Sequence, residues 1–443
     1  MRIALINPPS PDGQIYIRDV NRSGRLSREG TIWPQTSLAM IAAVLAPHDV
    51  KIWDCIATRT NYGTLFKELQ AFAPDWVVIE SVSATIMHDM IVAHYAKYLK
   101  AKTVLISPHG EALADETRAR FPTLDHLVHY DKHEEPEYEI RRLITGVDRG
   151  PDETFATLPP ARQDLLPLSR YHLPLIGRGY TFVLTSRGCP WRCIYCRQTV
   201  TWQSRVRYRP VQAIVDEIKR YRLTNIAFHA DTATVNRKQM LDLCGEFMNL
   251  PWRIRWICNS RVDTVDLELL QAMKSAGCWM VCYGVESGND TVLKMNKKEA
   301  TVAQAEQAVR WAKQAGLKVW TYMMLGMYGD TKETMDETIN LACRLEGDIC
   351  NFALAAPYPG TEWGRVAQAQ GWLSDTRWEA YDQNVSAIVD QPDCSHHDVL
   401  KAQKQAYRRW YGSWRGVKFF LNAWRPQYTR FLFNVARNHQ LGT

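Results

Sequence analysis

Three cysteines, Cys189, Cys193 and Cys196, stand in a run that reads Arg-Gly-Cys-Pro-Trp-Arg-Cys-Ile-Tyr-Cys from residue 187. Thiolates are soft ligands that suit iron–sulfur clusters, and three of them leave one iron of a four-iron cluster without a protein ligand. Such an iron can bind a small molecule. The alternatives are a zinc site that lacks its fourth ligand, or cysteines that only fill the core. Structural zinc usually has four ligands in paired Cys-x-x-Cys spacing, which disfavours the first.

Length and composition indicate a multidomain protein outside the membrane. The chain has 443 residues, more than one core usually supports. No stretch approaches the ~20 apolar residues of a membrane span, and an early proline interrupts the N-terminus too soon for a signal peptide. Eleven dispersed cysteines without a secretion signal favour a reducing, cytoplasmic compartment. The net charge of +7 gives little support for anionic partners.

Strand-like and helix-like segments alternate from the N-terminus to residue 147. Apolar runs at 2–7, 50–54, 76–81, 103–107 and 126–130 are separated by helical patterns such as 35–45 and 62–73. This alternation predicts a doubly wound parallel sheet, a Rossmann-like α/β domain. Ligands of such sheets bind at the carboxyl ends of the strands. The candidate pocket there consists of Asn7, Asp54, Ser81, Ser83, Ser107 and His109. The alternative is that these small polar residues only begin turns.

A second alternating region follows a Pro-rich and Leu-rich linker, which we expect to pack on the surface. Its predicted strands cover 181–187, 225–231, 253–260, 279–286, 318–326 and 348–356, with helical patterns between them. Repeated βα units of this kind predict a partial (β/α)6, TIM-like barrel, with chemistry at the carboxyl ends of its strands. The expected domains are 1–147 (Rossmann-like), 148–175 (linker), 176–370 (barrel) and 371–443 (helical, aromatic and basic).

The Cys-x-x-x-Cys-x-x-Cys spacing after a predicted strand resembles the signature of the radical SAM superfamily. The resemblance implies that Cys189, Cys193 and Cys196 hold a [4Fe-4S] cluster whose open iron chelates S-adenosylmethionine (SAM). Glu286, in Tyr-Gly-Val-Glu-Ser-Gly from residue 283, resembles the glutamate that accepts hydrogen bonds from the methionine amino group. Ser260 and Arg261 end the third barrel strand and are expected at the ribose or carboxylate of SAM. The remaining expected SAM contacts are Tyr195, Gly284, Leu325 and Ala356.

Two of these assignments have ordinary structural alternatives. Glu286 could be a surface glutamate in a turn. Arg261 could form a salt bridge with Asp263, two residues further along the chain.

A Rossmann-like domain ahead of the cysteine run resembles the cobalamin-binding branch of that superfamily. The resembling residues are Asn7-Pro8-Pro9, the strand that ends at Asp54, and Pro108-His109-Gly110. Asn7, Asp54, Ser81, Ser83, Ser107 and His109 are therefore the expected cobalamin contacts. Asp54 is followed by Cys55-Ile56, so the chain offers no histidine there as a lower axial ligand. Ile106-Ser107 replaces the usual glycine pair and would crowd a nucleotide tail. The alternative is a scaffold whose pocket is empty or altered.

Ordered runs such as Arg261-Val262-Asp263 and Pro357-Tyr358-Pro359-Gly360-Thr361 are similar to the group of anaerobic magnesium-protoporphyrin ester cyclases, hopanoid-tailoring enzymes and cobalamin-dependent C-methyltransferases. The resemblance implies reductive cleavage of SAM by a ferredoxin or flavodoxin electron, and functionalisation of a C–H bond on a hydrophobic small molecule of lipid, hopanoid or tetrapyrrole type. Cobalamin-assisted methyl transfer is the expected outcome. The alternatives are cobalamin-independent cyclisation or C–C or C–O bond formation, a non-catalytic corrinoid or iron–sulfur sensor, and a tRNA-modifying enzyme.

Aromatic and basic residues alternate near the C-terminus, from Tyr407-Arg408-Arg409-Trp410-Tyr411 to Trp424-Arg425 and the stretch 428–437. The favoured interpretation is a set of helices that cap the barrel with their cations in water. The second is contact with a membrane surface. Nucleic acid is not an expected partner, because no appended RNA-binding module is recognisable.

Overall fold

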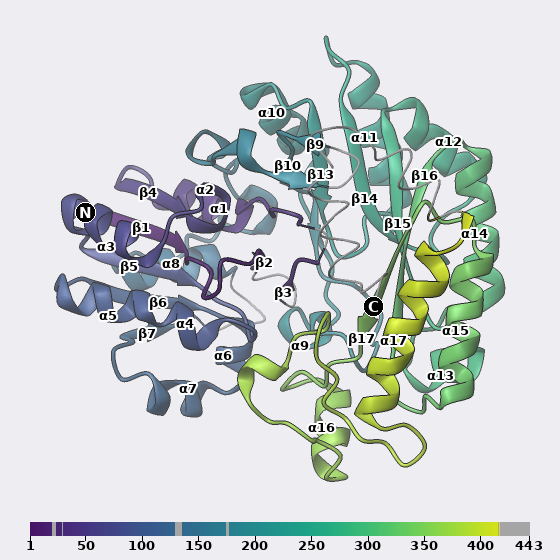
Figure 1. Ribbon diagram of the computed structural model, residues 1–443. Coiled ribbons are helices and arrows are strands. Elements are labelled where there is room, and N and C mark those ends of the chain that lie inside the picture. Colours follow the sequence, from purple (N-terminus) through teal and green to yellow (C-terminus); the bar gives the residue numbers. More distant parts are fainter. Residues whose placement is uncertain (20–23, 29, 129–134, 174–176, 415, 417–443) are drawn as a thin grey trace.

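The computed structural model describes residues 1–19, 24–28, 30–128, 135–173, 177–414 and 416 (Figure 1). Two parallel sheets lie side by side, the N-terminal one on the left of Figure 1 and the larger one on the right. Both predicted α/β units are therefore present, and the predicted fold class is confirmed. Much of the aromatic and basic C-terminal stretch, from residue 417 on, lies outside the described residues.

The N-terminal sheet has the strand order β4-β1-β5-β6-β7, and every neighbouring pair is parallel. Its strands are β1 (Arg2–Asn7), β4 (Asp49–Asp54), β5 (Trp76–Glu80), β6 (Lys102–Ile106) and β7 (His126–Leu127).

Alternate residues of β1 bury themselves on opposite faces of the N-terminal sheet. Ile3 and Leu5 join a core with α1 (Thr36–Val44) and α8 (Pro136–Thr145). Ala4 and Ile6 join a second core with α3 (Tyr62–Phe72) and α5 (Ile91–Tyr98). Side chains alternate between the faces of a strand, so helices on both faces require consecutive apolar residues, as in Ile3-Ala4-Leu5-Ile6.

The larger sheet has the strand order β10-β13-β14-β15-β16-β17, again all parallel. Its strands are β10 (Thr181–Leu184), β13 (Asn225–His229), β14 (Arg255–Arg261), β15 (Cys278–Glu286), β16 (Lys318–Leu325) and β17 (Ile349–Leu354). Consecutive strands are neighbours, as expected of a partial barrel.

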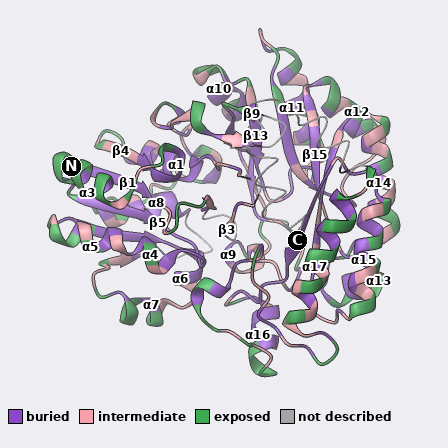
Figure 2. Ribbon diagram, viewed as in Figure 1, coloured by how far each residue is buried: buried purple, intermediate pink, exposed green. Residues whose placement is uncertain are grey.

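Helices cover the outer face of the larger sheet (Figure 1). They are α10 (Val211–Tyr221), α11 (Arg237–Met248), α12 (Leu267–Ser275), α14 (Val302–Gln314) and α15 (Lys332–Arg344). The long helix α17 (His396–Tyr411) packs on α15 and β17. Figure 2 shows the strands buried and the outward helix faces exposed. None of the helices in the described ranges is long and apolar enough to span a membrane.

A hairpin of β2 (Tyr16–Ile17) and β3 (Arg25–Leu26) extends from the N-terminal sheet into the space between the two sheets (Figure 1). The backbone N–H of Leu26 donates to Asp382 Oδ2 (2.7 Å), and Asn384 Nδ2 donates to the carbonyl oxygen of Leu26 (2.7 Å). Asp382 and Asn384 are themselves buried. The hairpin is thus fixed to a segment more than 350 residues away in sequence.

The segment 148–173, the predicted linker, is partly exposed and partly buried. It forms three short 3-10 helices, at Phe155–Thr157, Gln163–Leu165 and Leu168–Arg170. Gln163 is fully buried, donates to Glu217 Oε1 (3.1 Å) and accepts from Thr181 (2.7 Å). A buried amide that meets all its partners fixes a segment in place, so this linker belongs to the barrel's packing.

Candidate functional site

The cysteine loop begins at a tight turn after β11 (Ser186–Arg187). Gly188 has a φ of +90°, and a Cβ at this position would overlap the carbonyl oxygen of Arg205. Only glycine meets both conditions. The backbone N–H of Gly188 donates to Asp231 Oδ2 (2.7 Å), which ties the loop to the end of β13.

One cavity of about 300 Å³ contains all three cysteines and most of the expected SAM residues. Ser260, Arg261, Gly284, Glu286, Tyr195 and Ala356 line it together with Cys189, Cys193 and Cys196. These residues follow or end several different strands, at the carboxyl edge of the larger sheet. The sequence places them far apart, and the parallel strand order gathers them around one space.

The donor set fits a cluster with three protein ligands. Among the described residues, no group of three or more His, Cys, Asp or Glu side chains converges on a single metal ion. The three thiols instead border one cavity wide enough for a larger group, which disfavours the zinc alternative. Burial raises the pKa of the Cys189 and Cys196 thiols. Iron binding would reverse that preference and release their protons, because positive metal charge favours the thiolates.

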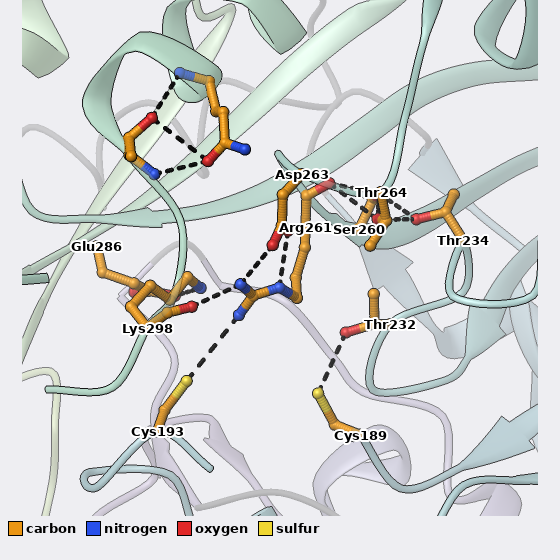
Figure 3. A network of polar contacts seen from close by, with 12 residues as sticks. Cys189, Cys193, Thr232, Thr234, Ser260, Arg261, Asp263, Thr264, Glu286 and Lys298 are labelled. Atoms are coloured by element: carbon orange, nitrogen blue, oxygen red, sulfur yellow. Dashed lines mark hydrogen bonds and ion pairs between the residues drawn. The ribbon is translucent and has the colours of Figure 1, made fainter. Parts of the chain in front are cut away.

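Arg261 is the centre of the polar network shown in Figure 3. Its Nε and Nη2 donate to the two carboxylate oxygens of Asp263 (2.8 Å each), and Nη2 also donates to the carbonyl oxygen of Lys298 (2.5 Å). Its Nη1 lies 4.0 Å from Cys193 Sγ, and its guanidinium lies 3.9 Å from the centre of the Trp191 ring. The salt-bridge alternative for Arg261 is therefore present, and the side chain borders the cavity as well.

Ser260 belongs to a chain of hydroxyl groups behind Arg261. Its Oγ lies 2.5 Å from Thr234 Oγ1, which lies 2.6 Å from Thr264 Oγ1. Cys189 Sγ lies 3.7 Å from the hydroxyl of Thr232, the preceding polar residue on the same loop as Thr234 (Figure 3). Hydroxyl groups on the loop after β13 thus reach both the first cysteine and Ser260.

Glu286 ends β15 in a strained backbone conformation. Its φ is +71°, a region that costs a non-glycine residue about 1 kcal/mol or more, and the strand register shifts between Gly284 and Glu286. Lys298 Nζ lies 3.0 Å from Glu286 Oε1. A Cβ on Gly284 would lie 2.5 Å from that oxygen and 3.1 Å from Lys298 Nζ. A side chain at Gly284 would therefore displace the ends of the Glu286 and Lys298 side chains. The surface-turn alternative for Glu286 does not hold, since its side chain is only 13% exposed.

Two expected SAM contacts differ in placement. Ala356 lines the cavity, whereas Leu325 is fully buried in the main hydrophobic core and does not. The residue before it, Met324, borders the cavity instead. Met323 borders the cavity as well, and contact between Leu325 and SAM stays a prediction. Tyr195 lines the cavity, and burial together with the adjacent thiols raises the pKa of its hydroxyl well above the usual value.

Several residues that line the cavity were missed by the sequence analysis. Lys298 follows a helix and no strand, and Asp231 and Thr232 follow β13. The other missed residues are Arg25, Trp33, Arg197, Gln198, Asn259, Cys282, Tyr322, Met323, Asn351, Ala353, Leu354, Tyr358 and Gln383. The position of Asp231 at a strand end was the one available signal.

The six expected cobalamin contacts lie together at the carboxyl edge of the N-terminal sheet, but their side chains interact with one another or with the protein around them. Asn7 Nδ2 donates to Asp54 Oδ1 (2.8 Å), Ser81 Oγ donates to Asp89 Oδ2 (2.8 Å), and Ser107 Oγ accepts from the N–H of Gly110 (3.2 Å). Ser83 Oγ lies 2.9 Å from His109 Nδ1. All six residues are buried.

Arg18, the residue directly after β2, fills the carboxyl edge of the N-terminal sheet. It is fully buried, and its Nη2 lies 2.7 Å from Asp89 Oδ1. It also donates to Asn7 Oδ1 (3.0 Å), the carbonyl oxygen of Pro8 (2.8 Å) and Thr85 Oγ1 (3.1 Å). A guanidinium with this many acceptors is a satisfied buried charge, which is costly to displace.

The ring of His109 lies between Trp378 and Tyr381, with centroid distances of 4.9 and 5.3 Å. Within the described ranges His109 Nε2 has no hydrogen-bond partner, and the cavity beside the ring measures about 10 Å³. Such a space holds about one water molecule. A corrin ring and its nucleotide tail would therefore need Arg18 or His109 to move from these positions.

Comparison with known proteins gives the same architecture. Residues 183–342 match the radical SAM superfamily. An uncharacterized methyltransferase of Pyrococcus horikoshii is 27% identical over 93% of this chain and 92% of its own length. The anaerobic magnesium-protoporphyrin IX monomethyl ester cyclase of Cereibacter sphaeroides is 24% identical over 91% of this chain and 72% of its own length.

Among solved structures, the cobalamin-dependent SAM radical enzyme OxsB, with aqua-cobalamin and SAM bound, matches with a TM-score of 0.69. The match covers 99% of this chain and 71% of the OxsB chain, at 14% sequence identity. The predicted similarity to the cobalamin-dependent branch is thus confirmed at the level of the fold.

Proposed function

We propose that this chain, which belongs to the radical SAM superfamily, cleaves SAM reductively and functionalises a C–H bond of a hydrophobic small molecule. One observation carries the proposal. The three cysteines share their cavity with Glu286 and Arg261 and with an apolar wall to which Tyr322, Met324 and Leu354 contribute. Charged and apolar groups in one space suit SAM and an apolar substrate side by side.

The cysteines and the charged residues of the cavity would each have a separate role. Cys189, Cys193 and Cys196 would hold a [4Fe-4S] cluster, and Glu286 would accept hydrogen bonds from the amino group of SAM. Arg261, with Nη1 turned toward Cys193, would contribute positive charge near the SAM carboxylate. When bound, the cluster and SAM supply a 5′-deoxyadenosyl radical that removes hydrogen from carbon. The apolar wall would orient the substrate and exclude water.

Two reactions could follow hydrogen removal: transfer of a methyl group to the substrate, or formation of a bond within the substrate. The relative named a methyltransferase supports the first, and the relative named a cyclase supports the second. Cobalamin-assisted transfer would need a corrinoid at the edge that Arg18 and His109 fill. This packing favours the cobalamin-independent outcome, a ring closure or a new C–C or C–O bond.

The expected partners remain part of the proposal. Radical SAM enzymes need an electron donor, and ferredoxin or flavodoxin would serve. A cytoplasmic location, and contact with a membrane surface through the C-terminal region, are consistent with an apolar substrate. The tRNA-modifying and sensor alternatives have no supporting observation in the described residues.

Anaerobic reconstitution with iron and sulfide tests the proposal. The reduced wild-type protein should convert SAM to 5′-deoxyadenosine. Cys193→Ala should abolish this, while Cys343→Ala, a half-buried cysteine on α15, should not. S-adenosylhomocysteine among the products would indicate methyl transfer. Intact SAM after incubation of cluster-loaded wild-type protein would refute the proposal.

A further inference from the structure

Arg25 brings a cation from the N-terminal hairpin into the barrel cavity. It lines the 300 Å³ cavity that also contains the cysteines. It lines a second, inner cavity of about 30 Å³ as well, and Trp33, Asn259, Cys282 and Tyr322 border both. Arg25 therefore stands where the two cavities meet.

The backbone of Arg25 is held in a fixed position. In the β2–β3 hairpin Arg25 pairs with Ile17, and the neighbouring Leu26 forms the two hydrogen bonds to Asp382 and Asn384 described above. Both oxygens of Asp382 are used by backbone N–H groups, Oδ2 by Leu26 (2.7 Å) and Oδ1 by Asn384 (2.8 Å). This buried carboxylate thus fixes the hairpin. Its charge acts on Arg25, but the described residues include no salt bridge between the two side chains.

The other cations of the cavity differ from Arg25 in having protein partners. Arg261 pairs with Asp263, Lys298 pairs with Glu286, and Arg197 Nη1 donates to the carbonyl oxygen of Pro359 (2.6 Å). In the described part of the chain, Arg25 forms no salt bridge, and its buried Nε has no hydrogen-bond acceptor. A half-buried guanidinium without an acceptor carries a desolvation cost that a bound anion would offset.

Apart from Asp382, whose charge acts on Arg25, the groups around Arg25 are apolar or neutral. Trp33 and Tyr322 border the same space, and Asn351 and Gln383 add amide groups. The planar fork of arginine donates two parallel hydrogen bonds to a carboxylate or a phosphate. An aromatic or aliphatic body would lie against the rings, with one acidic group directed at Arg25.

We infer that the substrate carries a carboxylate or phosphate group on an apolar body, and that Arg25 binds this group. The inference rests on the proposed function for the location of the substrate. It specifies the substrate class as acidic and amphipathic, and excludes a purely hydrocarbon substrate.

Binding of matched probes to the reconstituted protein with SAM tests the inference. One pair is 1-naphthaleneacetate and its neutral amide, and the other is 1-naphthyl phosphate and 1-naphthol. We expect the wild type to bind the anion of at least one pair about tenfold more tightly than its neutral counterpart, as measured by isothermal titration calorimetry. The pair that shows the preference identifies the acidic group.

Arg25→Met should abolish the preference, and Arg25→Lys should retain part of it. Arg28→Met is the matched control, because Arg28 lies on the same loop but donates to Gln403 Oε1 (3.1 Å) and stacks over Tyr407. It should keep the wild-type preference. Circular dichroism of each variant establishes that it is folded.

Equal binding of anion and neutral probe by the wild type, or an unchanged preference in a folded Arg25→Met variant, would overturn the inference. The same samples are assayed for 5′-deoxyadenosine formed with dithionite. SAM cleavage without anion preference refutes the role of Arg25 alone, and absence of cleavage refutes the proposed function.

Discussion

Lys298 Nζ lies 3.0 Å from Glu286 Oε1, and the carbonyl oxygen of the same lysine accepts a hydrogen bond from Arg261. One residue thus connects the two side chains at which SAM is expected (Figure 3). The pair is nearly enclosed, with side chains 6% and 13% exposed. Glu286 reaches it from a strained backbone, so Lys298 contributes to holding the carboxylate toward the cavity.

Lys298→Met should destabilise the protein by about 3 kcal/mol, because it leaves the Glu286 carboxylate in a buried site without its partner. Urea unfolding followed by circular dichroism measures the change. The neighbouring Lys297 forms an exposed salt bridge with Glu362, so Lys297→Met should cost less than about 1 kcal/mol. Equal effects of the two substitutions would show that the buried pair is unimportant.

Glu286→Gln should weaken SAM binding about tenfold or more, since a neutral amide forms weaker hydrogen bonds to an ammonium than a carboxylate does. Equilibrium dialysis with labelled SAM and cluster-loaded protein measures the affinity. Glu362→Gln, on the exposed side of α16 (Glu362–Ala369), is the control and should bind as the wild type does. Unchanged affinity in Glu286→Gln would remove that residue from the SAM site.

Acid should destabilise the protein through His109. Burial lowers the pKa of His109 to about 3, with Arg197 contributing. The unfolded chain therefore binds a proton below about pH 6.5 that the native state does not bind, and stability falls as the pH falls. Between pH 7.5 and 5.5 this group should account for about 1.4 kcal/mol.

The His109→Gln variant should lose that part of the pH dependence, as measured by urea unfolding at the two pH values. His94→Gln, an exposed histidine on α5, should keep it. A wild-type pH dependence in the His109→Gln variant would mean that His109 titrates normally in the native state.

Arg18→Met should destabilise the N-terminal sheet by roughly 3 to 5 kcal/mol, because Asp89 would remain buried without a counterion. Adding Asp89→Leu should recover part of the loss, since an apolar pair tolerates burial better than a lone charge. Arg118→Met, which removes an exposed salt bridge with Asp115, should have little effect. Urea unfolding compares the three variants, and a double variant no more stable than the single one would contradict this account.

Cobalamin uptake tests the packing at the same edge. Hydroxocobalamin incubated with the protein should be largely removed by gel filtration, leaving well below one equivalent by absorbance. The expectation follows from the contacts of Arg18 and from the small space beside His109. One retained equivalent would show that this edge opens for the corrinoid and would favour methyl transfer.

The two parallel α/β units and the cluster loop could be predicted because both follow from short-range patterns. Apolar runs of strand length alternate with helical periods in both halves of the chain. Ser260 and Glu286 were found because they end strands. The burial of the Leu325 side chain could not be predicted, since the apolar run Met323-Met324-Leu325 at the end of β16 gives no alternation from which to tell its faces. Arg18, Arg25 and Lys298 were missed because their side-chain partners are 9 to 71 residues away or absent from the described residues.

The β2–β3 hairpin supplies a wall of a cavity whose cysteines belong to the other half of the chain. A protein made by joining this barrel to a different N-terminal half would keep the cluster loop and lose Arg25 and Trp33. Recombination between homologues at the domain boundary would therefore be expected to change which molecule is accepted while leaving the radical chemistry in place. The N-terminal half can diversify selectivity only as long as its hairpin still reaches Asp382.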